Sequence, residues 1–478
     1  MILNLKPYPE YKDSGVDWLG QVPAHWEVVP LKRLAWFKSG AGFPVHYQGE
    51  TSAEIPFFKV SDMNIRGNEK YLHVCANTVS MAVAQDLGAT VLPAGTIVFP
   101  KVGGALLTNK RRIAANQCCI DNNMMGCVVR NGNRDFLFLI MNYIDLGQIA
   151  KPGPVPAISE GEVREIRVAL PSAPEQTAIV RFLDWAERRI RRYIRAKQNL
   201  IKLLEEYKQV LIHRAVTGQI DVRTGRPYPA YKDSGIEWLG KVPAHWDVRR
   251  LKTAVYHINE QTSTKNDEDL CIALEHVESW TGRLLVASGE AQFDSQVKRF
   301  QAGDVLFGKL RPYLAKVVRP KQSGVCVGEF FVLRARPVVA PHYLEVVLRS
   351  APAIDFVNSS TYGAKMPRAD WTFVGAMLFP LPPLPEQTTI VEYLDAQTTK
   401  IDAAIAAARR EIELLREYRT RLIADVVTGK ADVREVAAQL PEEPPEDIEA
   451  AAEEAEGEGE IDPAEIAESD IGGDADEV

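Results

Sequence analysis

Two short stretches of the chain place basic and amide side chains directly after an apolar run. The first, VFPKVGGALLTNKRRIAANQ, begins at Val98, and the second, VLFGKLRPYLAKVVRPK, begins at Val305. Lys and Arg neutralise phosphates, and Arg, Lys and Asn donate hydrogen bonds to base edges. Both stretches therefore have the composition of a polyanion-binding loop. The candidate binding residues are Lys101, Asn109, Lys110, Arg111 and Arg112 in the first stretch and Lys309, Arg311, Tyr313 and Lys316 in the second.

The same lead-in precedes both loops, as GTIVFPK at 95–101 and GDVLFGK at 303–309. Its β-branched and aromatic residues predict a strand. In the first loop Gly103 and Gly104 predict a tight hairpin, because glycine tolerates left-handed backbone. A shared strand with unlike loops suggests a scaffold that carries two different binding loops. The alternative is a solvated basic hairpin at an ordinary sheet edge.

Three further sets of residues are weaker candidates for contact with a polyanion. Ser61, Asp62 and Asn64 lie in KVSDMNIRG, and Lys365 and Arg368 lie in TYGAKMPRAD. A basic run also occurs on a predicted helix, where a solvated face or a docking surface for a partner is the alternative. The run consists of Arg188, Arg189, Arg191, Arg192 and Arg195.

The elements that position these loops come from an internal duplication. Residues 8–32, YPEYKDSGVDWLGQVPAHWEVVPLK, return at 228–252 as YPAYKDSGIEWLGKVPAHWDVRRLK, with 18 of 25 positions identical. A second motif, PEQTAIVRFLD at 174–184, returns as PEQTTIVEYLD at 385–395. The Trp and His residues of the first block favour packing of each domain against a helix end over a catalytic or metal role. One scaffold therefore occurs twice around two dissimilar inserts.

Each second motif opens a long predicted helix. Ser172 and Glu175 form a capping box at the start of the first helix, and Gly218 and Gly429 follow the two helices at the position that terminates them. Roughly 40 residues make a rod of about 60 Å. The apolar positions recur at alternating spacings of three and four, which predicts a coiled-coil seam. The predicted seam residues are Ile179, Leu183, Ala186, Ile190, Tyr193, Leu200, Leu204, Tyr207 and Leu211, and Ile390, Leu394, Ile401, Ile405, Ala408, Ile412, Leu415, Leu422 and Val426.

The predicted fold class is α+β, with two globular mixed domains joined by two antiparallel helices that form a coiled coil with a pseudo-twofold internal repeat. Each insert mixes short β-rich runs with Gly and Pro punctuation and a few short helices. The predicted boundaries are 1–170 for the first domain, 172–217 for the first helix, 218–381 for the second domain, 383–428 for the second helix and 435–478 for an acidic tail.

Composition excludes several classes of protein. Hydrophobic content of 46% and charged content of 25% are ordinary for a soluble globular protein. The chain has no run of about 18 apolar residues and its N-terminus has no signal-peptide pattern, so we expect a cytoplasmic protein without a membrane span. Six cysteines without CxxC spacing predict reduced thiols and no metal site.

Charge is distributed unevenly along the chain. The net charge is −8, but residues 435–478 contain 18 Asp and Glu and no Lys or Arg. The remaining 46 acidic side chains are outnumbered by 56 Lys and Arg, so the body carries about +10, which is compatible with a polyanionic partner. The tail lacks aromatic residues and is predicted to be disordered. It either adds solubility or shields the basic surface until nucleic acid displaces it.

The paired YKDSG(V/I)(D/E)WLG(Q/K)VPAHW blocks and the paired PEQT(A/T)IVxxLD helix starts resemble the specificity subunit of a type I restriction-modification system. The resemblance covers residues 8 to about 434 and leaves out the acidic tail. It implies that the two inserts are target-recognition domains, each binding one half of a bipartite, asymmetric double-stranded DNA sequence. It also implies that the helices act as a spacer and dock two methyltransferase subunits, with restriction subunits completing the complex.

The sequence contains no motif for catalysis. It has no GxxxxGK(S/T) phosphate loop, no Asn-Pro-Pro-Tyr or Asp-Pro-Pro-Tyr tetrapeptide, no HExxH and no nucleophile elbow. We therefore expect a non-catalytic subunit without a cofactor of its own. The resemblance implies that partner subunits bind S-adenosylmethionine, ATP and Mg²⁺ and carry the adenine methyltransferase and ATP-dependent endonuclease activities. Two alternatives stay open: an orphan subunit that supports methylation only, and a coiled-coil scaffold that binds proteins rather than DNA.

Overall fold

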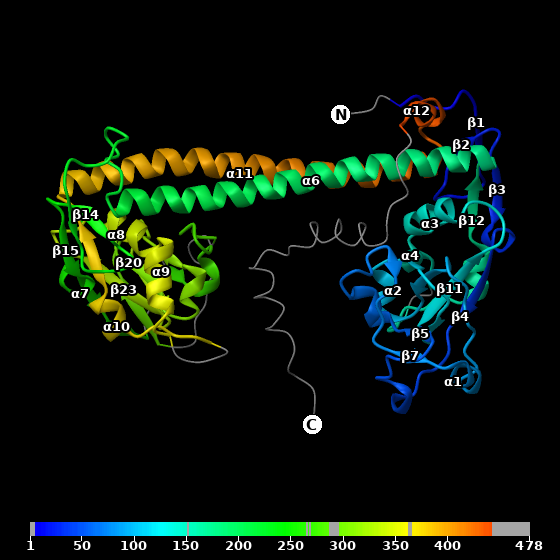
Figure 1. Cartoon of the computed structure of the whole chain (residues 1–478), viewed down its shortest axis with the longest axis horizontal. Coiled ribbons are helices and arrows are strands. Elements are labelled where there is room, and N and C mark those ends of the chain that lie inside the picture. The colour runs from blue at the N-terminus through cyan, green and yellow to red at the C-terminus, as the bar shows by residue number, and fades with distance from the viewer. Residues whose placement is uncertain are drawn as a thin grey trace. The chain divides into compact units, whose positions relative to one another are not determined.

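The structure is a computed structural model, and it describes residues 5–150, 153–263, 266, 269–285, 296–361 and 366–441. The chain divides into two compact units, each containing one globular domain and parts of two long helices (Figure 1). Within the described residues, unit 1 comprises the chain up to Gln198 and from Arg409 onward, and unit 2 comprises Asn199–Ala408. The boundary of the units thus crosses both helices, whereas the predicted map treated each helix as a separate segment.

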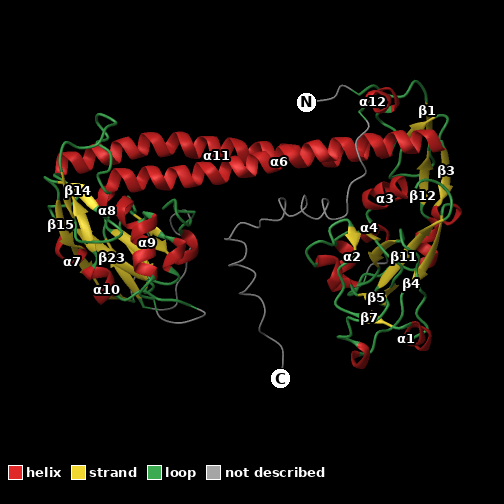
Figure 2. Ribbon diagram, in the orientation of Figure 1, coloured by secondary structure: helices red, strands yellow, loops and turns green. Residues whose placement is uncertain are grey.

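The globular domain of unit 1 contains two main sheets with short helices around them (Figure 2). The five-stranded sheet consists, in spatial order, of β4 (Ala35–Ser39), β11 (Met124–Val129), β8 (Ile97–Pro100), β9 (Arg112–Ala114) and β6 (Tyr71–Leu72). The three-stranded sheet consists of β10 (Cys119–Ile120), β5 (Ile55–Phe58) and β7 (Thr78–Val79). The short helices are α1 (Met81–Asp86), α2 (Gly103–Leu107), α3 (Arg134–Tyr143), α4 (Leu146–Ile149) and α5 (Glu160–Glu165).

The globular domain of unit 2 repeats this arrangement. The order β4-β11-β8-β9 returns as β16 (Val255–Ile258), β23 (Phe330–Ala335), β20 (Val305–Gly308) and β21 (Val317–Val318). A second sheet contains β17 (Gln261–Thr262), β19 (Val297–Phe300), β22 (Gly324–Val327) and β18 (Leu270–Ile272), and its parallel β18–β22 pair corresponds to β5–β10. The short helices are α7 (Leu251–Ala254), α8 (Pro341–Leu348), α9 (Ala351–Asn358) and α10 (Trp371–Ala376).

In each globular domain one buried cluster lies between the two sheets. In unit 1 Phe58 of β5 and Val98 of β8 share one buried cluster, and in unit 2 Ile272 of β18 and Leu306 of β20 do the same. These strands consist of β-branched and aromatic residues that suit a surface buried against another sheet. The predicted mixed α/β class is therefore confirmed for both domains.

Two-stranded ladders connect each globular domain to the helices. The repeated block forms β1 (Tyr11–Asp13) with β2 (Gln21–Pro23), and β3 (Glu27–Pro30) pairs antiparallel with β12 (Arg167–Leu170). In unit 2 β13 (Tyr231–Asp233) pairs with β14 (Lys241–Pro243), and β15 (Asp247–Arg250) pairs antiparallel with β24 (Leu378–Leu381). Since β12 and β24 run directly into the long helices, the near-identical blocks hold each helix start against its domain.

The long helices are α6 (Ala173–Val216) and α11 (Leu384–Val427). In unit 1 Glu187 of α6 bonds Arg419 of α11, and Lys197 lies 2.7 Å from Glu411, so the helices run antiparallel. In unit 2 Lys208 Nζ lies 2.6 Å from Asp402 Oδ1. No helix in the described part of the chain has the length and apolar composition to cross a membrane.

Burial agrees with the predicted seam on α11 and corrects it on α6. Of the nine seam residues predicted on α11, eight are buried and Leu415 is half-buried. On α6, however, Tyr193, Leu200 and Tyr207 are exposed, while Ile194 is fully buried. The buried position thus shifts by one residue, from Tyr193 to Ile194. An α-helix has 3.6 residues per turn, so its buried face drifts away from a strict seven-residue repeat.

The two ends of the described chain meet in unit 1. The Tyr11 hydroxyl donates to the Gly429 carbonyl at 3.1 Å, just as the Tyr231 hydroxyl donates to Gly218 at 3.1 Å in unit 2. A contact made within one continuous segment in unit 2 is therefore made in unit 1 by segments from opposite ends of the sequence.

The short helix α12 (Arg434–Gln439) extends this junction. Arg434 lies 5.0 Å above the Tyr8 ring and pairs with Asp432, and Ala437 is buried. The boundary predicted at residue 435 falls inside this helix. Of the predicted acidic tail, residues 442–478 lie outside the described residues.

Candidate nucleic-acid interface

In unit 1 the end of β8 is held on both sides by backbone hydrogen bonds. The Lys101 amide donates to the Asn123 carbonyl at 2.8 Å, and the Lys101 carbonyl accepts from Ile158 at 2.9 Å. Two residues later the Gly103 amide donates to Pro156 at 2.7 Å. This clamp fixes where the first candidate loop leaves the sheet. The Lys101 side chain donates to the Ser39 hydroxyl at 2.9 Å.

In unit 2 the end of β20 is held by the same three bonds. The Lys309 amide donates to Glu329 at 2.9 Å, and the Lys309 carbonyl accepts from Ala369 at 2.8 Å. Two residues later the Arg311 amide donates to Pro367 at 2.8 Å. The two lead-in lysines therefore occupy one equivalent position in two domains of unlike sequence.

The chain diverges directly after this clamp. In unit 1 Gly103 and Gly104 begin helix α2, so the predicted tight hairpin is wrong, although β8 and β9 do pair antiparallel. In unit 2 a 3₁₀ turn, Pro312–Leu314, is flanked by Arg311 and Ala315, whose φ angles are 49° and 48°. The left-handed backbone of these two residues is strained for side chains other than glycine.

Arg111 does not reach the surface of unit 1. It is 1% exposed, its guanidinium lies 5.2 Å above the Phe99 ring, and it donates to Asn109 Oδ1 at 2.7 Å and to the Ile144 carbonyl at 3.4 Å. Burial lowers the pKa of Arg111 to about 10. This burial disfavours the predicted DNA contact of Arg111, since the side chain supports the loop from inside. Asn109, with φ 53° and an oxygen bonded to Arg111, belongs to the same support.

Lys110 and Arg112 join two of the predicted candidate stretches. Lys110 Nζ donates to Asn64 Oδ1, and Arg112 donates to the Met63 carbonyl at 3.2 Å. Burial lowers the pKa of Arg112. Of the KVSDMNIRG candidates Asp62 is buried, whereas Ser61 and Asn64 are exposed. The structure thus brings residues 60–64 and 110–112 together.

In unit 2 the candidate loop also meets a second stretch. Leu310 forms a β-bridge with Arg368, and Arg368 donates to Glu329 Oε1 at 2.9 Å. Lys316 donates to the Leu274 carbonyl at 2.9 Å, while Tyr313 is 43% exposed. The predicted candidate Lys365 lies outside the described residues.

Sequence reasoning missed the charged groups that lie near Lys309. Lys298 is buried and donates to the Phe330 carbonyl at 2.9 Å, and its pKa is lowered by burial and then by the charge of Lys309. Burial also lowers the pKa of His257, with further contributions from Lys298 and Lys309. Lys298 and Lys309 are therefore two ammonium groups close together, with the carboxylate of Glu329 near Lys298 and a His257 ring that the lowered pKa keeps neutral at neutral pH. Because His257, Lys298 and Lys309 are far apart in the sequence, no local motif predicts that they lie together.

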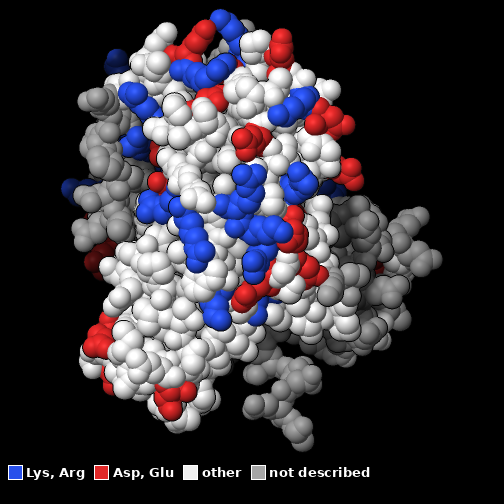
Figure 3. Space-filling view, turned by 90° about the vertical axis from the view of Figure 1, so that its right-hand side faces the viewer, with Lys and Arg blue, Asp and Glu red and all other residues white. Residues whose placement is uncertain are grey.

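A basic surface also lies outside the predicted loops. Figure 3, which views the molecule from the side of unit 1, shows Lys and Arg side chains gathered near the centre of this face. Arg167 is opposite Pro30 in the β3–β12 ladder, and the Arg130 amide bonds Leu34, which brings distant basic residues together. The exposed basic residues around β3 and β12 are Lys32, Arg33, Arg130, Arg164 and Arg167.

The basic run on α6 makes contacts within the helix pair. Arg191 lies 3.0 Å from Glu187 as an i,i+4 pair, and Arg189 lies 5.0 Å above the Trp185 ring. Since Glu187 also bonds Arg419, part of the run holds the helices together. These contacts favour a structural role for that part over a DNA contact.

The Trp and His residues of the repeated block bind the start of each long helix. His25 Nε2 lies 2.9 Å from Glu175 Oε1, and Trp26 donates to the same oxygen at 3.3 Å. Burial alone would raise the pKa of Glu175, but the hydrogen bonds from His25, Ser172 and Trp26 lower it. In unit 2 His245 lies 2.9 Å from Glu386. These contacts agree with the predicted packing role.

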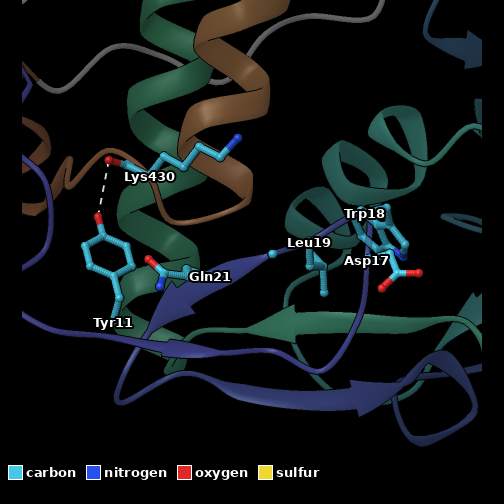
Figure 4. A pocket seen from close by; sticks show the side chains of 7 residues that line it. Tyr11, Asp17, Trp18, Leu19, Gln21 and Lys430 are labelled. Carbon is cyan, nitrogen blue, oxygen red and sulfur yellow. Dashed lines mark hydrogen bonds between the residues drawn. The ribbon is translucent and has the colours of Figure 1, made fainter.

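Figure 4 shows an open hollow of about 440 Å³ beside this block in unit 1. The Tyr11 hydroxyl reaches the Lys430 carbonyl across it at 3.4 Å. The hollow therefore marks the junction of the N-terminal block with the end of α11. Its lining residues are Tyr11, Asp17, Trp18, Leu19, Gly20, Gln21 and Lys430.

The chain is similar to known proteins in both sequence and structure. No family model matches the chain. The chain is 23% identical over 447 residues to the type I restriction enzyme EcoDI specificity subunit of Escherichia coli, an alignment that covers 86% of this chain and 93% of that protein. A chain from a structural study of complex assembly and conformational transition of the type I R-M system superposes with a TM-score of 0.63 and 17% identity, over 85% of this chain and 98% of its own. The HsdS subunit of Thermoanaerobacter tengcongensis gives a TM-score of 0.49 and 17% identity, over 86% and 98%.

The sequence similarity spans both repeated halves, because an alignment over 86% of the chain cannot be confined to one of them. The solved structure with a TM-score of 0.63 shares the fold over a similar extent. The curated homologue of this chain is a type I restriction enzyme specificity subunit, and the resemblance to that family indicated by the two repeated motifs is thereby confirmed.

Proposed function

We propose that this chain is the sequence-specific DNA-binding subunit of a type I restriction-modification complex. Each globular domain binds one half of a bipartite DNA target, and the two halves differ because the two binding loops differ. Sequence discrimination requires donors and acceptors at base edges, while Lys and Arg hold the phosphates. The proposed contacts come from Lys101, Lys110 and Arg112 in unit 1 and from Lys309, Arg311, Tyr313, Lys316 and Arg368 in unit 2.

One observation carries this proposal. The order of four strands in one sheet and the three-bond clamp are the same in both domains, yet the loops that leave the clamp differ in sequence, secondary structure and backbone angles. A duplicated scaffold with diverged loops is expected for two domains that bind two different half-sites of one DNA duplex. The basic surface around β3 and β12 supports a polyanionic partner.

The long helices are proposed to set the gap between the half-sites. We infer that α6 and α11 form an antiparallel coiled coil along their length and relate the two halves by a pseudo-twofold axis. The gap would then follow from helix length, as it does for other two-headed proteins on a helical duplex. Lengthening both helices by whole turns should widen the gap and leave both half-sites unchanged.

The outer face of α6 supports the docking of methyltransferase subunits. Leu200, Leu203, Tyr207 and Val210 follow one another at helical spacing, and each is at least 42% exposed in unit 2. Isolated exposed apolar residues are ordinary, but a row along one helix face marks an interaction surface. Methyltransferase and restriction subunits would supply S-adenosylmethionine, ATP and Mg²⁺ and the chemistry itself.

Methylome sequencing of cells that co-express the chain with its methyltransferase partner tests the proposal. We expect one bipartite, asymmetric methylated sequence with a constant gap. Methylation at a short continuous palindrome would contradict it. Methylation that is unchanged when this chain is omitted would favour the protein-binding scaffold instead.

A further inference from the structure

The shared clamp allows the two binding loops to be aligned residue by residue, although their sequences do not align beyond it. Lys101 and Lys309 are identical in type and hold the same place in the same backbone bonds. The next equivalent position pairs Gly103 with Arg311, since each donates its amide across the clamp. Both have left-handed φ angles, 72° for Gly103 and 49° for Arg311.

The neighbours of the clamp differ between the domains as well. The bridge of Val102 with Ala157 corresponds to that of Leu310 with Arg368, so alanine stands where the second domain has arginine. Asn123 and Glu329 likewise provide equivalent carbonyls from unlike residues. The clamp therefore keeps one side chain constant and varies those around it.

We infer that Lys101 and Lys309 bind DNA phosphate, and that Arg311 is a specificity-determining residue that contacts a base. This inference rests on the proposed function. Two domains that bind different half-sites have only the sugar-phosphate backbone of the DNA in common, so an invariant side chain in an invariant frame suits a phosphate. A side chain that changes at an equivalent position suits the part of the DNA that changes, which is the base pair.

The surroundings of the two lysines suit a phosphate. Lys101 donates to the neutral hydroxyl of Ser39, while the amide of Ser39 donates to the Glu160 carboxylate at 2.6 Å. Lys309 lies near enough to Lys298 and His257 to influence the pKa of both. Within the described ranges, neither lysine forms an ion pair with a carboxylate. Since neither ammonium group is held in an ion pair within these ranges, each can take a phosphate as its partner.

The backbone of Arg311 points to a role for its side chain. Left-handed φ destabilises any residue other than glycine, and the first domain has glycine at this position. Strained residues persist where the surroundings hold them, and they gather at functional sites. Here the amide of Arg311 is held by Pro367 at 2.8 Å and its carbonyl by Leu314 at 3.0 Å. A fixed backbone aims the guanidinium, whose fork can bind the O6 and N7 atoms of guanine.

The test measures DNA binding by the chain assembled with its methyltransferase partner. The duplexes carry the methylated target of the host genome, and a set of variants changes each base pair of either half-site in turn. Each duplex is titrated at several salt concentrations with the wild-type complex and with the K101A, K309A and R311G complexes. R311G gives the second domain the residue that the first domain carries at the same place.

K101A and K309A should each weaken binding to all duplexes by a similar factor and reduce the slope of log affinity against log salt by about 1. R311G should abolish a preference of roughly tenfold or more at one base pair of one half-site and leave the other half-site unchanged. Because R311G removes backbone strain, its melting temperature should equal or exceed that of the wild type. An unchanged or higher melting temperature shows that the lost preference comes from a lost base contact and not from a destabilised fold.

Retention of every base preference by R311G would overturn the assignment of Arg311. A change in preference at a single base pair in K101A or K309A would overturn the phosphate assignment. A wild-type complex that binds all duplexes equally would instead overturn the proposed function, and this inference with it.

Discussion

At the scale of single residues, neighbours in the sequence have opposite roles. Lys110 and Arg111 are adjacent basic residues, yet Lys110 lies at the surface beside Asn64 and Arg111 is buried against Phe99. The buried guanidinium satisfies Asn109 and a carbonyl of the chain, so its removal leaves polar groups without partners. Lys110, by contrast, makes its side-chain hydrogen bond to Asn64 at the surface, so its removal leaves no buried polar group without a partner.

Replacing Arg111 with Ala should therefore lower the free energy of unfolding by about 2–4 kcal/mol, from unsatisfied polar groups and a cavity. Replacing Lys110 with Ala should change it by no more than about 0.5 kcal/mol. Denaturant titration followed by circular dichroism measures both, and DNA binding should weaken for Lys110→Ala while its stability is unchanged. Equal stability of the two variants would contradict the buried role of Arg111.

At the scale of elements, the long helices end against the repeated block. Gly218 follows α6 with φ +72°, and a Cβ at this position would lie 2.3 Å from Pro243 and 3.1 Å from Trp246. Gly429 follows α11 in the same way, against Pro23 and Trp26. Glycine is required here twice, once for the left-handed turn and once for the close approach.

Gly218→Ala and Gly235→Ala separate these two requirements. Both glycines have φ +72°, but an added Cβ at Gly235 meets nothing within 4 Å. We expect Gly235→Ala to cost about 1–2 kcal/mol for the backbone alone and Gly218→Ala to cost a further 1–3 kcal/mol or so for the clash. Thermal unfolding of the two variants measures the difference. Equal losses would show that the block does not close on the helix end.

The shifted seam of α6 makes a second prediction at this scale. Ile194 is 0% exposed and Tyr193 is 52% exposed, although the two are adjacent. Ile194→Ala should cost about 2–4 kcal/mol, whereas Tyr193→Ala should leave the stability of the isolated chain nearly unchanged. Urea titration distinguishes them, and the reverse order would restore the seam predicted from the heptad pattern.

At the scale of the whole molecule, charge is separated between the body and the C-terminal segment. Residues 442–478 contain 17 Asp and Glu and no Lys or Arg, while the described part of the chain carries an exposed basic surface around β3 and β12. Because α12 packs in unit 1 through Arg434 and Ala437, the segment to remove begins at 442 rather than at 435. A tethered polyanion competes with DNA for a basic surface.

Deletion of residues 442–478 should raise the affinity for nonspecific DNA several-fold at low salt, and the gain should disappear at high salt, where charges are screened. Fluorescence anisotropy with a random duplex measures this. The matched control keeps the tail length and replaces its Asp and Glu with Asn and Gln, and it should behave like the deletion. Unchanged affinity in both variants would leave the tail with a role in solubility alone.

Much of the fold follows from the sequence because its signals are local. The helix starts at Ser172 and Glu175, and the ends at Gly218 and Gly429 follow from capping chemistry within a few residues. The lead-in strands before Lys101 and Lys309 follow from β-branched and aromatic composition. The hairpin expected at Gly103 failed because glycine permits a left-handed residue without deciding whether a turn or a helix follows it.

The sequence alone determined the duplicated scaffold, the two long helices, the mixed domains and the family resemblance, because repeats and periodicity are properties of the chain itself. Tertiary structure alone decided which basic residues reach the surface, which face of α6 is buried and which residues of the unlike loops are equivalent. The pairing of Gly103 with Arg311 depends on contacts with Pro156 and Pro367, more than 50 residues further along the chain. Burial and equivalence arise from such distant contacts, and no local pattern contains them.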